Sequence, residues 1–163
     1  METALTAEEL AKIQEDTDFI KGLAEQYMQH IGGSINADNM QMLTTSQHTL
    51  LAYSIILDEV MEGGFIQLIM NGWGPYIFFN PFATILREWG AVDLARIINK
   101  AKKEYQKYRV ELEKDCSDEE FMALYEKLDK LNELGDDFLD DIQEVATPLI
   151  AQYVRDNMDE FTV

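Results

Sequence analysis

Apolar side chains recur along most of this chain at steps of three or four residues, which places them on one face of an α-helix. Over residues 6–31 such a stripe includes Leu10 and Ile20. Thr6 and Glu9 have the spacing of a capping box, in which each side chain bonds the backbone amide of the other residue. The pattern therefore predicts an N-terminal helix over residues 6–31.

Further stripes predict that the rest of the chain is helical as well. Asn80 and Pro81 have the residue types of an N-cap and a first helical position, and Gly90 has that of a left-handed C-cap. Pro148 predicts a kink or a break in the last helix. The expected helices cover residues 45–62, 65–70, 81–90, 93–114, 117–135 and 136–161. Since no alternating strand pattern occurs, the predicted fold is all-α, a single compact domain of about six to eight helices over residues 1–163.

The composition indicates a globular protein and restricts its partners. Apolar residues make up 47% of the 163 residues, too many for a disordered chain, and the formal net charge is −18. A protein this anionic is repelled by DNA, RNA and anionic lipid surfaces. We therefore expect no direct contact with nucleic acid or membranes, and a partner selected by charge is expected to be basic.

Two segments of the chain indicate where in the cell the protein is expected and whether it enters a membrane. The N-terminus METALTAEEL is polar and acidic, unlike a signal peptide, and a single cysteine excludes an internal disulfide framework, so a reducing cytoplasm is expected. Residues 63–86 carry no charged side chain, but glycine and proline interrupt them. Because a bilayer cannot satisfy the backbone groups that such residues free, we expect a buried core segment or one half of a subunit interface.

Residues suited to catalysis or metal binding are few. His30 lies near the end of a predicted helix and His48 near the start of another, and no zinc-protease, nucleophile-elbow or phosphate-loop motif occurs. Cys116 stands among acidic residues, which disfavour a reactive thiolate. The run from Asp136 to Asp141 lacks the glycine and spacing of a calcium-binding loop. We expect no enzyme, no cofactor and no specific metal site.

The acidic residues concentrate toward the C-terminus. Residues 111–163 contain 17 acidic against four basic residues, and so carry 13 of the 18 excess negative charges. Within them, Asp129, Glu133, Asp136 or Asp137, Asp140 and Glu144 follow three- and four-residue steps along ~22 Å of helix. The expected acidic row consists of these carboxylates and Asp141, seven in all: Asp129, Glu133, Asp136, Asp137, Asp140, Asp141 and Glu144. DNA presents one phosphate per ~3.4 Å along each strand, so this acidic row offers a comparable line of negative charge. An ordinary solvated helix face is the alternative interpretation.

A more specific pattern lies in the segments DEVMEGGFIQLIMNGWG and ILREWGAVDLARIINKA. The pattern consists of small, polar and aromatic residues at fixed positions: Glu59, Gly63, Gly64, Phe65, Gln67, Asn71, Gly74, Gly90 and Ala101, and further along Phe138, Tyr153, Asn157 and Phe161. With these residues the chain resembles a bacterial family of DNA-mimic proteins over residues 50–161, which leaves the N-terminal helix outside. The resemblance implies an acidic helical protein, dimeric in at least one member, that occupies the DNA-binding surface of a transcription regulator.

We interpret these motif residues as mainly structural. Gly63-Gly64 allows a sharp turn between helices, and Phe65 is expected to fill the core. Glu59 is expected to accept hydrogen bonds from backbone amides, and Asn71 to cap a helix end. A pocket lined by Glu59, Gln67 and Asn71 is the alternative.

Two functions follow from these patterns. In the first, a non-enzymatic acidic protein presents its acidic row to a basic DNA-binding protein, such as a transcription regulator, and blocks access to DNA. In the second, a structural or regulatory helical module binds its partner, or a second copy in a homodimer, through the apolar segment 63–86. An enzyme with a carboxylate-lined pocket is the least favoured alternative.

Overall fold

A computed structural model of the protein describes residues 6–115 and 117–163. Cys116, which we predicted to be unreactive, lies outside the described residues. So do residues 1–5 of the N-terminus, which we expected to be unlike a signal peptide. Every regular element of the described residues is helical, which confirms the predicted all-α class. In chain order the elements are α1 (Ala7–Ala11), α2 (Asp16–His30), the 3-10 turn η1 (Met40–Met42), α3 (Thr45–Leu68), the π-helical turn η2 (Ile69–Trp73), α4 (Gly74–Phe78), α5 (Phe82–Glu88), α6 (Val92–Leu112), α7 (Asp118–Lys127), α8 (Asp129–Asp137), the π-helical turn η3 (Phe138–Ile142), α9 (Gln143–Asp156) and α10 (Met158–Phe161).

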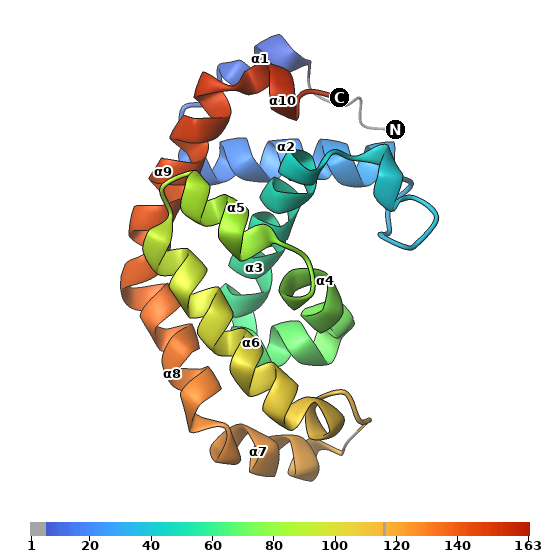
Figure 1. The fold of residues 1–163 in the computed structure, drawn as a ribbon, viewed down its shortest axis with the longest axis vertical. Helices are drawn as coiled ribbons and strands as arrows, with labels where there is room; N and C mark the ends of the chain where they lie inside the picture. The colour runs from blue at the N-terminus through green and yellow to red at the C-terminus, as the bar shows by residue number, and fades with distance from the viewer. Residues whose placement is uncertain (1–5, 116) are drawn as a thin grey trace.

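Helix α3 is the centre around which the others pack. It contacts α2, α4, α5, α8 and α10, and residues 47–54 at its start are buried on every side. Helix α6 crosses the molecule diagonally, and α8 and α9 follow one long edge beside it (Figure 1). The buried apolar side chains of these elements form one continuous cluster. No helix of the described part of the chain is long and apolar enough to span a membrane.

The predicted N-terminal helix is interrupted. Residues 12–15 separate α1 from α2, although the capping box of Thr6 and Glu9 forms as predicted. The Glu15 carboxylate accepts the N–H of Asp18 at 2.6 Å and caps α2. This hydrogen bond lowers the pKa of Glu15 below its ordinary value. A new helix therefore starts after Glu15, although the apolar stripe continues, because the Glu15 side chain satisfies one of the first backbone amides of α2.

Several predicted boundaries also differ. Helix α5 begins at Phe82, because the Asn80 side chain donates to the carbonyl of Tyr76 at 2.8 Å instead of capping α5. The expected helix over 117–135 is two helices, α7 and α8, which meet at Leu128. Pro148 neither breaks nor ends α9, which continues through it. Gly90 has the predicted left-handed conformation, with φ of 101°.

Candidate functional site

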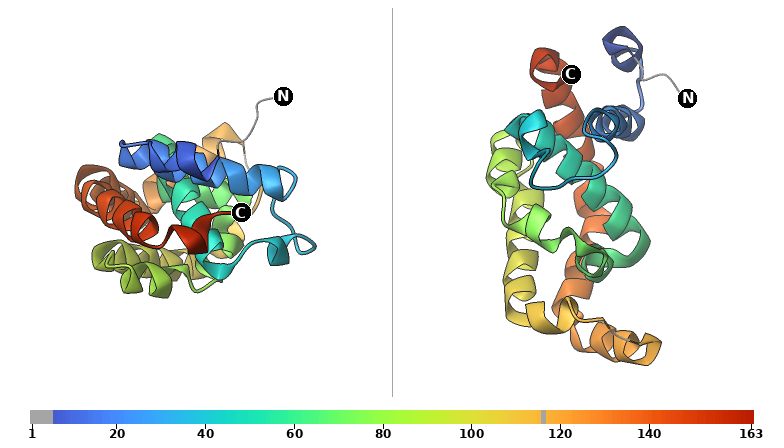
Figure 2. Two further views of the ribbon diagram at one scale, coloured as in Figure 1. Left: turned by 90° about the horizontal axis from the view of Figure 1, so that it is seen from above. Right: turned by 90° about the vertical axis from the view of Figure 1, so that its right-hand side faces the viewer.

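The acidic row lies on one continuous helical edge. Helix α8, turn η3 and helix α9 follow one another without a non-helical residue, and we call residues 129–156 the rod. The rod forms the left edge of the molecule in Figure 1 and runs beside α6 in both Figure 1 and the right-hand view of Figure 2. Leu131, Phe138 and Ile150 are each 0% exposed and anchor its inner side. The rod is thus a rigid support for whatever its outer side carries.

A buried hydrogen bond also ties the rod to the central helix. The Tyr53 hydroxyl on α3 lies 2.5 Å from the Thr147 hydroxyl on α9. Both side chains are buried, so water does not compete for the bond. Burial raises the pKa of Tyr53 to about 12, and the bond to Thr147 opposes this rise.

The π-helical turn η3 aligns the two halves of the rod. A π-helical turn contains about one residue more than an α-helical turn, so it rotates the following positions by roughly 100°. The rotation returns Ala146 and Ile150 of α9 to the buried side on which Phe138, the first residue of η3, lies. Asp136 and Asp140, on either side of this point, remain exposed.

All seven carboxylates of the acidic row are exposed. Within the described residues, none of them makes an ion pair or a side-chain hydrogen bond. Four of them project from the rod, and the other three line grooves between the rod and α6. The outer carboxylates are Asp129, Asp136, Asp140 and Glu144, and the groove-lining ones are Glu133, Asp137 and Asp141.

The structure adds a basic row that was missed in the sequence. Arg96, Lys100, Lys103 and Lys107 are exposed on α6 at steps of four, three and four residues. Lys100 and Lys103 line a groove of about 360 Å³ together with Lys130 of α8 and the carboxylates Glu104, Glu133 and Asp137. The spacing of these four cations in the sequence, at steps of three and four residues, could have predicted that they share one face of a helix. The charges of Glu133 and Asp137 are therefore partly compensated by these lysines, whereas Asp141 lines a different groove without a basic residue and the outer four face solvent.

The predicted motif residues meet at the end of α3, with partners that differ from expectation. One Glu59 carboxylate oxygen accepts the side-chain amides of Gln67 at 3.0 Å and of Asn71 at 2.8 Å. Glu59 thus bonds side chains rather than backbone amides, and Asn71 bonds Glu59 instead of capping a helix. A Cβ atom on Gly63 would lie 2.0 Å from the Gln67 side-chain oxygen, so this cluster needs a glycine there.

The remaining motif residues shape the core. Gly64 has φ of 74°, in the region that favours glycine, and it creates the turn inside α3. Phe65 directly after it is fully buried. Gly74 lies against the Tyr105 ring of α6, which a Cβ atom would approach to 2.6 Å. These contacts position α4 and α6 against the central helix.

Comparison with known proteins connects this arrangement to a family. The sequence profile described as DMP19-like protein matches residues 41–157. The chain belongs to the DMP19-like family. A curated relative, the DNA mimic protein DMP19 of Neisseria meningitidis serogroup B, is 31% identical over 159 residues, covering 98% of this chain and 96% of the relative. The similarity therefore also includes the N-terminal helices, which the expected range of 50–161 left out.

In this DMP19-like protein the apolar segment 63–86 is mainly internal. Phe65, Phe78 and Phe82 are at most 2% exposed. Phe79 is 46% exposed, and the Arg109 guanidinium lies over its ring at 5.1 Å. A homodimer contact built from several aromatic residues would thus have Phe79 as its main exposed contributor.

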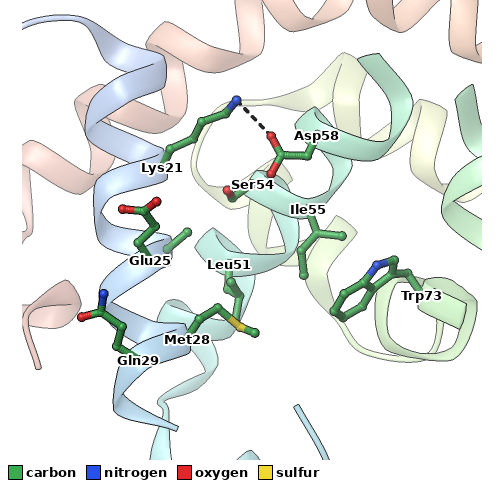
Figure 3. Close-up of a pocket in the computed structure, with 10 residues that line it drawn as sticks. Lys21, Glu25, Met28, Gln29, Leu51, Ser54, Ile55, Asp58 and Trp73 are labelled. Carbon is green, nitrogen blue, oxygen red and sulfur yellow. Dashed lines mark ion pairs between the residues drawn. The ribbon is translucent and has the colours of Figure 1, made fainter. Parts of the chain in front are cut away.

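A pocket of about 360 Å³ opens between α2 and α3 (Figure 3). Met28, Leu51, Ile55 and Trp73 form its apolar part, and the Lys21 ammonium pairs with the Asp58 carboxylate at 2.9 Å on its rim. Exposed Glu25 also lines the pocket, so the rim carries a net negative charge beside this ion pair. Ser54 lines the pocket as well, on the same face of α3 as Asp58.

His48 of this DMP19-like protein has a structural environment. One ring nitrogen, Nε2, lies 2.7 Å from the Met40 carbonyl, and the other, Nδ1, lies 2.8 Å from the Tyr76 hydroxyl. Since a carbonyl only accepts, Nε2 carries a proton and donates it to Met40. Among the residues described, no group of His, Cys, Asp or Glu is arranged to hold a metal ion.

Proposed function

We propose that this protein is a non-enzymatic DNA mimic whose rod occupies the DNA-binding surface of a basic protein, such as a transcription regulator. The observation that carries the proposal is the set of exposed carboxylates on one continuous helical edge, free of intramolecular ion pairs among the described residues. A carboxylate already paired with a lysine would have to exchange partners, whereas a solvated one contributes its full charge.

Membership of the DMP19-like family supports the same function. The similar meningococcal protein is named a DNA mimic, and the alignment covers nearly all of both chains. The net charge of −18 gives this chain the attraction to basic surfaces that such a function requires. The outer carboxylates are the main contact in this proposal, because Lys100 and Lys103 of α6 repel a cationic partner from the groove that they line beside the rod.

The experiment is capture of partners on the immobilised protein, followed by elution with duplex DNA. A basic DNA-binding protein should bind at low salt and be released by DNA, because both ligands use one surface. The decisive variant replaces the four outer carboxylates by amides: Asp129→Asn, Asp136→Asn, Asp140→Asn and Glu144→Gln. A control variant with the same change in net charge uses exposed carboxylates elsewhere: Glu8→Gln, Glu25→Gln, Asp38→Asn and Asp159→Asn.

The two variants separate a specific surface from general charge. Loss of the partner with the rod variant alone supports the proposal. Equal weakening by both variants would show that only net charge matters, and a partner that DNA does not displace would contradict mimicry.

The second candidate, a binding module that uses segment 63–86, is favoured only by exposed Phe79. It predicts binding, or a homodimer, that persists at high salt and is lost in Phe79→Asp.

A further inference from the structure

The acidic row ends in an apolar notch. Val92 at the start of α6 and Val145 and Leu149 on α9 are 46%, 60% and 39% exposed. Together they line a depression of about 170 Å³ between the two helices. A cavity of about 150 Å³ holds a benzene molecule, so the notch has room for one large apolar side chain.

The position of these three residues distinguishes them from scattered exposed apolar residues. They come from two helices and line one depression, whereas exposed apolar residues that stand singly are ordinary on protein surfaces. Val110, by contrast, is 82% exposed on α6 and lines none of the depressions described above. The notch is thus a local concentration of apolar surface on an otherwise charged face.

The charges around the notch indicate what could occupy it. Asp141 lines it and also belongs to the acidic row, so notch and row are continuous. Asp93 lines the opposite side, where its carboxylate is shared with Arg96 at 3.1 Å. An occupant that matches both features carries an apolar group among positive charges.

We infer that the notch receives one large apolar side chain from the basic surface of the partner protein, beside the charges that contact the acidic row. This inference rests on the proposed function and deepens it. Charge alone attracts every cationic surface, and such attraction weakens with salt. Burial of an apolar side chain in the notch adds affinity that persists as salt rises, and it selects among basic proteins by shape.

The test uses two synthetic helical peptides with equal length and equal numbers of lysine and arginine residues. One peptide carries a central Phe and the other a Gln at the same position. Their affinities are measured by fluorescence anisotropy at rising salt, against the intact protein, Val145→Ser and the matched control Val110→Ser. Methyl NMR signals of Val145 and Val110 report where each peptide binds.

The Phe peptide should bind the intact protein and Val110→Ser about tenfold more tightly than the Gln peptide, and this ratio should persist as salt rises. In Val145→Ser the ratio should fall toward one, and in the intact protein only the Val145 methyl signals should shift. Equal affinities for both peptides, or a ratio unchanged in Val145→Ser, would overturn the inference. It would also be overturned if the Val145 signals moved on dilution without peptide, since a second copy would then occupy the notch.

Failure of the proposed function gives a different result. If amides at the four outer carboxylates leave the affinity of the Gln peptide unchanged, the acidic row does not attract basic partners. The Phe-to-Gln ratio is unaffected by that outcome, so the two conclusions are tested separately.

Discussion

The hydrogen bond between Tyr53 and Thr147 offers a sharp test of how the rod is held. It joins the central helix to α9 between two buried side chains, at 2.5 Å. Removing one partner of a buried hydrogen bond typically costs about 1–3 kcal/mol, whereas replacing both partners by apolar groups of similar shape is nearly neutral. The two single substitutions are not expected to be equal.

Thr147→Val leaves the Tyr53 hydroxyl, in a side chain that is 0% exposed, without its partner. We expect a loss of about 2 kcal/mol in the free energy of unfolding, or ~4–8 °C in Tm for a chain of this size. Tyr53→Phe should cost only about 1 kcal/mol, because a helical threonine hydroxyl can turn back to the carbonyl four residues earlier. The double variant should lose less than the sum of the two single variants.

Unfolding in denaturant, followed by circular dichroism, gives the four free energies of this cycle. Thr49→Val is the matched control, since the hydroxyl of buried Thr49 bonds only the Thr45 carbonyl within the same helix, at 2.8 Å. It should cost clearly less than Thr147→Val. Strictly additive effects in the double variant, or a Thr147→Val protein as stable as the control, would refute the assignment of this bond as a link between the rod and the core.

Three further outcomes are expected. Gly74→Ala should lower the free energy of unfolding by about 1–3 kcal/mol, because the new methyl group would overlap the Tyr105 ring. Thermal unfolding measures this loss, and a variant as stable as the parent protein would contradict the tight packing of α4 on α6. Burial raises the pKa of Tyr53 from 10.0 to about 12, so its contribution to stability is complete below pH 10 and lost as the pH rises through 12. In an alkaline titration the part of the tyrosinate absorbance that comes from Tyr53 should therefore appear only together with unfolding, and ionisation of every tyrosine before unfolding would contradict this. Replacing both Lys100 and Lys103 by Gln should tighten the binding of a basic partner several-fold at low salt, because two repulsive charges beside the rod are removed. If the immobilised variant retains the partner no more strongly than the parent protein does, the partner does not approach the groove between α6 and the rod.

The helical class and most of the core could be predicted from apolar spacing alone, because helical periodicity is a local property. Thr44, Thr6 and Ser117 begin their helices within a residue of the predicted positions. The break before α2 could not be predicted from the apolar stripe, since the chain at the break is also held by Arg155 of the rod, which donates to the Ile13 carbonyl at 2.9 Å. Contacts between residues so distant in sequence leave no periodic signal.

The candidate site was predictable in part for the same reason. The acidic row was visible as a spacing, but which carboxylates project outward depends on the neighbouring helix. Glu133 and Asp137 face Lys100 and Lys103 only because α6 packs beside the rod. The apolar notch likewise combines Val92 with residues of α9, so it exists only in the folded protein.

The π-helical turn η3 has a consequence for variation among related chains. Removing one residue between 138 and 142 would convert the wide turn into an ordinary one and rotate everything after it by roughly 100°. Ile150 would then leave the core while the carboxylates before the turn kept their direction. Single-residue deletions within residues 138–142 should therefore destabilise the fold far more than substitutions there. Among related chains we expect the number of residues in this turn to vary less than their identity.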